Sequence, residues 1–300
     1  MLAVARHLSR QAGWAEPMRF ETSIHDPGTG CAEEALRAGA DAVIVVGGDG
    51  TVRAVADAMA DTRVPLAIVP SGTGNLFARN LGIPLDDPER AMAAAFGPRR
   101  REVDLGRIGV TRPDGAVDDA AFVVMAGMGM DAAMIANTRP RLKKAVGWVA
   151  YVDGVARSLP RARPFPILLQ TDRSRVRSTR VYSILFANCG ALPAGIALIP
   201  DASLEDGRMD VVLIRPAAWW GWLAVWRRVW WDNSVLRRFR AGRLVLERRR
   251  DQSVHYLRAV TADAGAHPPQ AVQLDGEPYG VATRLTCRIL PGALLLADSR

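Results

Sequence analysis

The first third of the chain contains a distinctive run of apolar and polar positions. Residues 43–46 (VIVV) are apolar and β-branched, which predicts a buried strand. GGDGT follows at once at 47–51, and residues 52–59 then place apolar and small residues at helical spacing. This order predicts a strand, a tight glycine turn and a helix.

The same order recurs shortly afterwards. LAIV at 66–69 predicts a second strand, PSGTGN follows at 70–75, and a helix is expected from residue 76 to residue 81. Gly47 and Gly72 are 25 residues apart, a spacing that suits neighbouring parallel strands. The loops after such strands open on the same edge of one sheet.

Further elements surround these two units. Apolar periodicity predicts helices at 1–11, 30–38 and 88–96, and alternation predicts a strand at 18–23. Gly39 is expected to end the second of these helices in a left-handed conformation. These elements predict an α/β domain with a parallel sheet.

The pattern changes after Gly97-Pro98, where three arginines (99–101) are expected either to form a solvated linker or to line an anion cleft. The predicted fold is therefore an α/β domain over residues 1–98, followed by a β-sandwich-like domain with helical insertions over residues 99–300. Helices are expected at 131–137 and 142–158. Strands are expected at 102–110, 120–126, 165–171, 181–188, 209–215, 254–261, 271–274 and 282–289.

The glycine loops have the chemistry of an anion site. Glycines let backbone N–H groups approach phosphate oxygens, and a helix N-terminus favours negative charge. No Lys-Ser/Thr pair follows the last glycine of GGDGT, so this is not a Walker-type loop. Ser71 and Thr73 offer hydroxyls and Asn75 an amide for phosphate and ribose contacts. The alternative is that the glycines serve packing alone.

Composition narrows the class of partner. The 300 residues are 49% hydrophobic and 23% charged, which are globular values, and the net charge is +8. This excess predicts an anionic partner: nucleic acid, an acidic membrane surface or a phosphorylated substrate. The three cysteines have no metal-ligand spacing and are expected to be reduced in a cytoplasmic protein. Residues 1–20 contain no long apolar stretch, so no secretory signal is expected there, and no run reaches the roughly 18–20 apolar residues needed to span a bilayer.

Much of the excess charge lies at residues 216–250, which hold nine arginines and two acids. Six of the eight tryptophans fall within residues 217–231. A helix there is expected to contact an anionic membrane, with core packing as the alternative. Because the aromatics share one helix face, nucleic-acid binding is disfavoured. The expected membrane contacts are Trp219, Trp222, Trp226 and Trp230.

Two acidic segments are candidates for catalysis and metal binding. Asp275 and Glu277 are two residues apart, so on extended backbone both carboxylates are expected to face the same way, and either could accept a proton. The alternative is a simple Asp-Gly hairpin turn. Asp49 is a competing candidate for the base. The oxygen-rich turn at 203–210 suits a hard cation such as Mg²⁺, or is only a polar turn.

GGDGT followed by SGTGN resembles the diacylglycerol-kinase catalytic domain family, which includes bacterial lipid kinases and the sphingosine kinases. Three later segments match the same family: GMGMDA at 127–132, PDASLEDGRMDV at 200–211 and DGE at 275–277. The resemblance covers nearly the whole chain. It implies an α/β nucleotide domain, a β-rich lipid domain and an active site between them.

The resemblance also implies an activity and residues that perform it. The expected enzyme transfers the γ-phosphate of ATP to a lipid hydroxyl, with diacylglycerol favoured, phosphatidic acid as its product, and sphingoid bases and phosphatidylglycerol as other acceptors. Glu277 is expected as proton acceptor, with Asp275 beside it. Mg²⁺ is expected at Ser203, Asp206 and the carbonyl of Arg208. The expected nucleotide contacts are Thr22, Gly47, Gly48, Asp49, Gly50, Thr51, Ser71, Gly72, Thr73, Gly74 and Asn75.

One departure from the family leaves alternatives open. Relatives begin with a strand and an N-P-x-x-G loop, whereas residues 1–11 predict a helix. We therefore expect either that the start codon is misassigned or that the chain is a truncated copy, which would act as a non-catalytic membrane- or lipid-binding relative. An NAD-kinase-like enzyme, which also carries GGDGT, is a further alternative. The enzyme is expected to be cytoplasmic, to lie at the surface of an anionic membrane and to bind no nucleic acid, and a homodimer is one assembly it could form.

Overall fold

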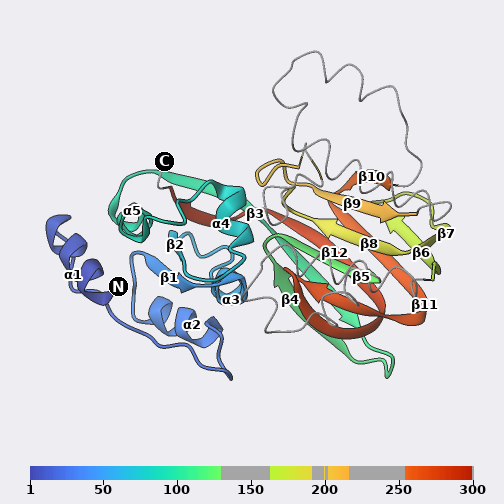
Figure 1. Ribbon diagram of the computed structural model, residues 1–300, viewed down its shortest axis with the longest axis horizontal. Helices are drawn as coiled ribbons and strands as arrows, with labels where there is room; N and C mark the ends of the chain where they lie inside the picture. The colour runs from blue at the N-terminus through green and yellow to red at the C-terminus, as the bar shows by residue number, and fades with distance from the viewer. Residues whose placement is uncertain (130–162, 191–198, 200–201, 216–253, 299–300) are drawn as a thin grey trace, which may run out of the picture.

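The computed structural model describes residues 1–129, 163–190, 199, 202–215 and 254–298 (Figure 1). The helices predicted at 131–137 and 142–158 lie outside the described residues, as does the tryptophan-rich segment at 217–231.

The N-terminal half contains a small parallel sheet with helices around it (Figure 1). β1 and β2 pair in parallel, from Val43 opposite Leu66 to Gly47 opposite Pro70, which confirms the predicted pairing. Each strand leads through its glycine loop into a helix, as predicted. The elements are α1 (Leu2–Gln11), α2 (Thr29–Arg37), β1 (Val43–Gly47), α3 (Asp49–Ala58), β2 (Leu66–Pro70), α4 (Leu76–Leu81), α5 (Pro88–Ala93) and the 3₁₀-helix η1 (Ala94–Phe96).

The strand predicted at residues 18–23 is wrong. This segment has neither helical nor sheet hydrogen bonding, and Met18 and Thr22 are exposed. Alternation of apolar and polar residues gives a strand only where a neighbouring strand accepts its backbone hydrogen bonds. The prediction that Gly39 ends α2 in a left-handed conformation is confirmed by its φ of +76°.

The second half is antiparallel and β-rich. Its strands are β3 (Arg100–Thr111), β4 (Val117–Phe122), β5 (Met125–Gly129), β6 (Phe165–Thr171), β7 (Arg177–Val181), β8 (Ser183–Ala187), β9 (Met209–Ile214), β10 (Val254–Ala259), β11 (Thr261–Leu274) and β12 (Glu277–Ala297). The order β12-β11-β5-β8-β9-β10 runs through the sheet, with β3 and β4 beside β12 and β6 and β7 beside β11.

β11 connects two layers of this half. Its first part pairs with β6 and β12, and its last residues pair with β5. A register shift between Gly265 and Gln270 separates the two pairings. Buried side chains from both layers, including Ile108, Phe122 and Phe186, form one core cluster between them. The predicted α/β domain followed by a β-sandwich-like domain is confirmed.

The two halves share a core and a sheet. One hydrophobic cluster contains Val52 and Val55 of α3. It also contains Leu105 of β3, Val123 between β4 and β5, and Leu294 of β12. The end of β12 also pairs with β2, Leu296 opposite Leu66, so the C-terminus returns to the N-terminal half (Figure 1). This packing fixes the helix after GGDGT against the β-rich half.

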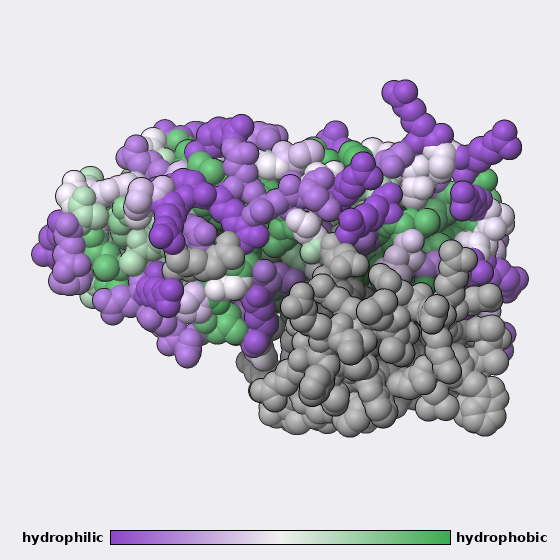
Figure 2. All heavy atoms as spheres, turned by 90° about the horizontal axis from the view of Figure 1, so that it is seen from above, coloured by the Kyte–Doolittle hydropathy of each residue, from purple (hydrophilic) through white to green (hydrophobic). Residues whose placement is uncertain are grey.

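The outer surface is mixed in character. On the face seen in Figure 2, hydrophilic residues cover much of the described surface, with smaller hydrophobic areas between them. None of the helices in the described part of the chain is long and apolar enough to cross a membrane.

Candidate active site

The two glycine loops lie against each other. A Cβ built on Gly72 would be 2.7 Å from the Gly48 Cα atom, and the Ser71 N–H donates to the Gly47 carbonyl over 2.9 Å. Any side chain on Gly72 would therefore push the loops apart. The close approach of these backbones explains why glycine stands at both positions.

Within the part of the chain that the structure describes, no side chain caps the first turn of α3. Its N-cap is Gly48, and no side-chain hydrogen bond is made there. The N–H groups of Asp49, Gly50 and Thr51 belong to the first turn, where a helix provides no acceptor. The Thr51 side chain lies against Gly47 rather than over these groups. This helix end is therefore prepared for an anion.

Asp49 points away from that helix end, toward α4. Its Oδ1 accepts a hydrogen bond from the Phe77 N–H over 3.4 Å, and its Oδ2 would be 2.7 Å from a Cβ built on Gly74. Burial raises the pKa of Asp49, and the backbone N–H groups of residues 75–77 act in the opposite direction. Asp49 thus fills the N-terminus of α4 and ties the two loops together.

Asn75 shapes its own loop. It adopts the left-handed conformation with φ of 48°, its Nδ2 donates to the Gly72 carbonyl over 2.8 Å, and its Oδ1 accepts from the Gly72 N–H over 2.9 Å. Its amide is therefore engaged within the loop. Ser71 and Thr73 are exposed, so their hydroxyls face solvent at the loop surface.

The DGE segment forms a tight hairpin turn between β11 and β12. Leu274 pairs with Glu277, and both central residues have positive φ, 49° at Asp275 and 80° at Gly276. This is the pattern of a type I′ turn. The expectation that both carboxylates face the same way is wrong, because it assumed extended backbone through the turn.

Asp275 turns inward. It is 3% exposed, and its carboxylate accepts hydrogen bonds from the N–H groups of Val123, Val124 and Met125 over 2.8–3.0 Å. Burial raises the pKa of Asp275 to about 6, while these N–H groups and the Arg53 charge act in the opposite direction. The carboxylate takes the place of a strand neighbour, which explains why the single strand predicted at 120–126 is divided into β4 and β5.

Glu277 turns outward, to the first turn of α3. A Cβ built on Gly50 would lie 2.9 Å from Glu277 Oε1, and Glu277 Oε2 accepts a hydrogen bond from Arg53 Nη2 over 3.0 Å. Arg53 Nη1 also donates to the Leu274 carbonyl over 2.9 Å. The fold thus joins the predicted base to the GGDGT loop. Arg53 was missed from the sequence; its only signal is its position one helical turn after Asp49 and Gly50.

The predicted metal turn has a buried acid beneath it. Asp104 accepts hydrogen bonds from the N–H groups of Gly207 (2.7 Å) and Gly292 (2.9 Å), and burial raises its pKa. Asp206 accepts from the Arg208 N–H over 3.1 Å, and Ser203 Oγ from the Glu205 N–H over 3.3 Å. The described residues contain no group of three acidic, His or Cys side chains that could hold a metal ion.

The remaining predicted contacts are Thr22 and four tryptophans. Thr22 is exposed on the segment before α2, and no hydrogen bond joins it to either glycine loop in the described part of the chain. Trp219, Trp222, Trp226 and Trp230 lie outside the described residues.

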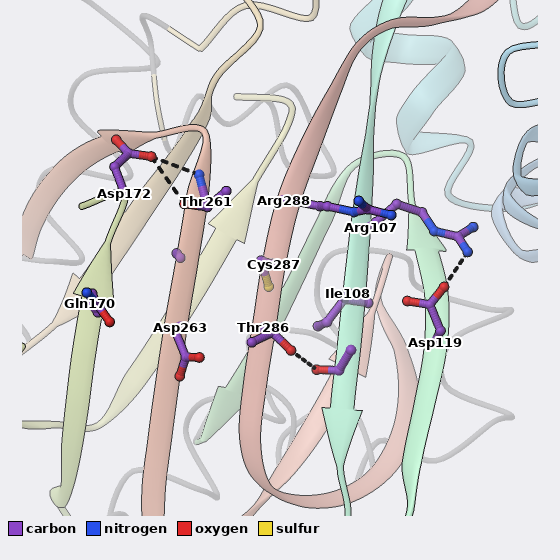
Figure 3. A pocket seen from close by; sticks show the side chains of 12 residues that line it. Arg107, Ile108, Asp119, Gln170, Asp172, Thr261, Asp263, Thr286, Cys287 and Arg288 are labelled. Atoms are coloured by element: carbon purple, nitrogen blue, oxygen red, sulfur yellow. Dashed lines mark hydrogen bonds and ion pairs between the residues drawn. The ribbon is translucent and has the colours of Figure 1, made fainter. Parts of the chain in front are cut away.

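A cavity of about 450 Å³ lies elsewhere, on β3, β4, β6, β11 and β12 (Figure 3). Neither glycine loop nor Glu277 lines it. Its carboxylates are already engaged: Asp119 pairs with Arg107, Asp172 accepts from backbone N–H groups of Val260 and Thr261, and Asp263 pairs with Arg284. We interpret this cavity as part of the solvated outer face of the sheet.

Comparison with known proteins relates both halves to one group. Residues 3–108 match the diacylglycerol kinase catalytic domain, and residues 122–298 match the YegS C-terminal NAD kinase beta sandwich-like domain. The chain is 29% identical over 284 residues to the diacylglycerol kinase of Bacillus subtilis (strain 168), covering 92% of this chain and 85% of that protein.

A second relative and a solved structure extend the comparison. A Pseudomonas fluorescens protein named "Probable lipid kinase YegS-like" is 31% identical over 290 residues, which cover 95% of this chain and 86% of the relative. A crystal structure of a diacylglycerol kinase from Bacillus anthracis str. Sterne has a TM-score of 0.68 at 19% identity, over 99% of this chain and 89% of that one. The structural likeness concerns the fold.

Proposed function

Because the chain belongs to the family of diacylglycerol kinases and YegS-like lipid kinases, we propose that it transfers the γ-phosphate of ATP to diacylglycerol, giving phosphatidic acid. The names of the relatives support this acceptor. A free hydroxyl on a lipid is the chemical requirement that the reaction places on it.

One observation carries the proposal. The Glu277 carboxylate, from the β-rich half, lies beside Gly50 at the uncapped N-terminus of α3. Phosphoryl transfer to a hydroxyl requires a cradle for the phosphate and a group that accepts the hydroxyl proton. The first turn of α3 supplies the former and Glu277 the latter.

The proposed reaction follows from this placement. N–H groups of the GGDGT loop bind phosphate oxygens of ATP and orient the γ-phosphate. The lipid hydroxyl oxygen attacks the γ-phosphorus while Glu277 Oε1 accepts its proton, and the bond to the bridging oxygen breaks to release ADP. Asp275 does not compete for this role, because three backbone N–H groups already occupy its buried carboxylate.

Mg²⁺ is part of the proposal. Ser203, Asp206 and the Arg208 carbonyl would hold it, and a Mg²⁺ bound there would offset the negative charge of the acidic turn. Two features of the described residues support an oxygen-rich cation site. The charges of Asp206 and Glu205 add to burial in raising the pKa of nearby Asp104. The buried Asn188 Oδ1, whose amide nitrogen donates to the Asp104 carbonyl, has no hydrogen-bond donor there.

The decisive experiment measures phosphate transfer from labelled ATP to a panel of lipids in mixed micelles. We expect Glu277→Gln to lower kcat roughly 100- to 10,000-fold, the usual contribution of a general base. Glu102→Gln is the matched control, because Glu102 is also an exposed glutamate paired with an arginine, Arg63. If folded wild-type protein phosphorylates no lipid, the kinase proposal fails in favour of a non-catalytic relative.

We further propose that the basic segment at 216–250 contacts an anionic membrane. Its nine arginines, two acids and clustered tryptophans support this. The test is flotation with anionic vesicles of the Trp222→Ala/Trp226→Ala variant, beside wild type and a Trp14→Ala control. We expect at least a tenfold loss of vesicle binding in the double variant only. Unchanged binding would favour internal packing of these tryptophans.

A further inference from the structure

Arg53 connects the two halves of the candidate site. It belongs to α3, yet both of its described hydrogen bonds go to the β11–β12 turn: Nη1 to the Leu274 carbonyl over 2.9 Å and Nη2 to Glu277 Oε2 over 3.0 Å. Its side chain is 19% exposed, whereas that of Glu277 is 48% exposed. The arginine is therefore the better anchored member of the pair.

Helical spacing places Arg53 on the face that carries the phosphate loop. Asp49 and Gly50 precede it by four and three residues, so all three lie on one side of α3. The planar guanidinium can bind two acceptors at fixed angles, which an ammonium group cannot reproduce. Here the two acceptors are the last residue before the turn and the first residue after it.

The consequence for Glu277 is a defined orientation. An exposed glutamate on a turn would otherwise sample several rotamers. With Oε2 bound to Arg53, Oε1 remains directed at Gly50, and no other hydrogen bond engages Oε1 within the described residues. We propose that Arg53 is a positioning residue that holds Glu277 at the first turn of α3, so that base and phosphate cradle keep a constant spacing. This inference rests on the proposed kinase function.

A positioning role for Arg53 predicts different effects of its removal on kcat and on the binding of ATP. Arg53 acts on the orientation of Glu277, and its described hydrogen bonds do not reach the glycine loops. Removal of the guanidinium should therefore slow transfer without weakening ATP binding. A direct contact with ATP phosphates would instead raise KM for ATP, and a purely stabilising ion pair would change only thermal stability.

The experiment is a double-mutant cycle in the mixed-micelle assay, with Arg53→Met, Glu277→Gln and the combined variant. We expect Arg53→Met to lower kcat about 10- to 100-fold, a cost comparable to misplacing a catalytic group by about 1 Å. KM for ATP should stay within about twofold of wild type. In the Glu277→Gln background, Arg53→Met should cost nothing further, because its effect acts through that carboxylate.

Two variants keep the test sharp. Arg53→Lys preserves charge and should recover only part of kcat; it also serves if Arg53→Met does not fold. Arg107→Met is the matched control, since Arg107 joins α3 to the β-rich half through Asp57 and Asp119 without touching Glu277. Its kcat should be unchanged.

Each contrary result is informative. Equal kcat for wild type and Arg53→Met, a large rise in KM for ATP, full additivity with Glu277→Gln, or an equal loss in Arg107→Met overturns the positioning role. Absence of lipid phosphorylation by wild type instead overturns the kinase function, and the positioning role with it.

Discussion

The first turn of α3 and the hairpin turn at residues 274–277 face each other across the site, and they differ in how their polar groups are used. None of the described side chains caps the α3 turn. In the hairpin turn, Asp275 binds three backbone N–H groups, Gln273 accepts from the Gly276 N–H, and Arg53 binds the Leu274 carbonyl. One side is open to a ligand and the other is already satisfied.

This difference indicates that the two turns have different roles at the candidate site. Unsatisfied N–H groups at a helix end are an anion site because they gain hydrogen bonds only when a ligand arrives. A turn held by this many hydrogen bonds is instead a rigid support for one exposed carboxylate, Glu277. The same contrast separates α3 from its neighbours, because carboxylates of Asp26, Asp49 and Asp87 occupy the N-termini of α2, α4 and α5.

The largest expected effect on stability concerns Asp275 in the hairpin turn, whose polar groups are hydrogen-bonded. Because the pKa of Asp275 is raised from 3.8 to about 6, the folded state favours the protonated carboxyl more than the unfolded state does. Its contribution to the free energy of unfolding is fully present below pH 3.8 and is lost as pH rises through 6. The difference between wild type and Asp275→Asn should therefore fall by up to about 3 kcal/mol across this window and level off above it.

Denaturant unfolding of both proteins between pH 3.5 and 7.5 measures this difference. Parallel stability profiles would show that Asp275 does not titrate there. A carboxyl NMR titration of Asp275 checks the assignment directly, with a midpoint near 6 expected.

The next largest effect concerns the two glycine loops at the start of α3 and α4. Gly72→Ala would place a methyl 2.7 Å from the Gly48 backbone, so the loops must separate. We expect a cost of about 2 kcal/mol in unfolding free energy and at least tenfold weaker ATP binding, measured by denaturation and by titration with ATP.

Gly50→Ala is the matched comparison for Gly72→Ala, and we expect it to change stability least. Its methyl would meet only the end of the Glu277 side chain, at 2.9 Å, and that flexible end can move. Stability should stay within about 0.5 kcal/mol of wild type, while kcat falls because the carboxylate is displaced. Equal stability losses in both variants would mean that the two sides are not built differently.

Local sequence patterns were sufficient for much of the fold. The runs at 43–46 and 66–69 became β1 and β2, and the glycine loops after them led into α3 and α4 as predicted. Asp-Gly at 275–276 indicated a hairpin turn and formed one. These outcomes depend on neighbouring residues alone: β-branched side chains, backbone freedom at glycine and helical spacing.

The errors in the predicted strands arose where residues distant in the sequence determine the local structure. The segment at 18–23 alternates like a strand but pairs with no strand among the described residues. The run at 120–126 is divided because the Asp275 carboxylate binds N–H groups within it. Neither event leaves a local signal. The same holds for Asp104, which supports the acidic turn through Gly207.

The sequence by itself determined which residues could serve a phosphate site: two glycine loops at helix starts and a pair of acids in a late turn. Only the tertiary structure decided where each of these acids lies. Positive φ at Asp275 and Gly276 sends one carboxylate into the core and the other to α3. The pairing of Arg53 with Glu277, 224 residues later, arises because α3 packs against the β-rich half, a contact set by buried area between distant segments.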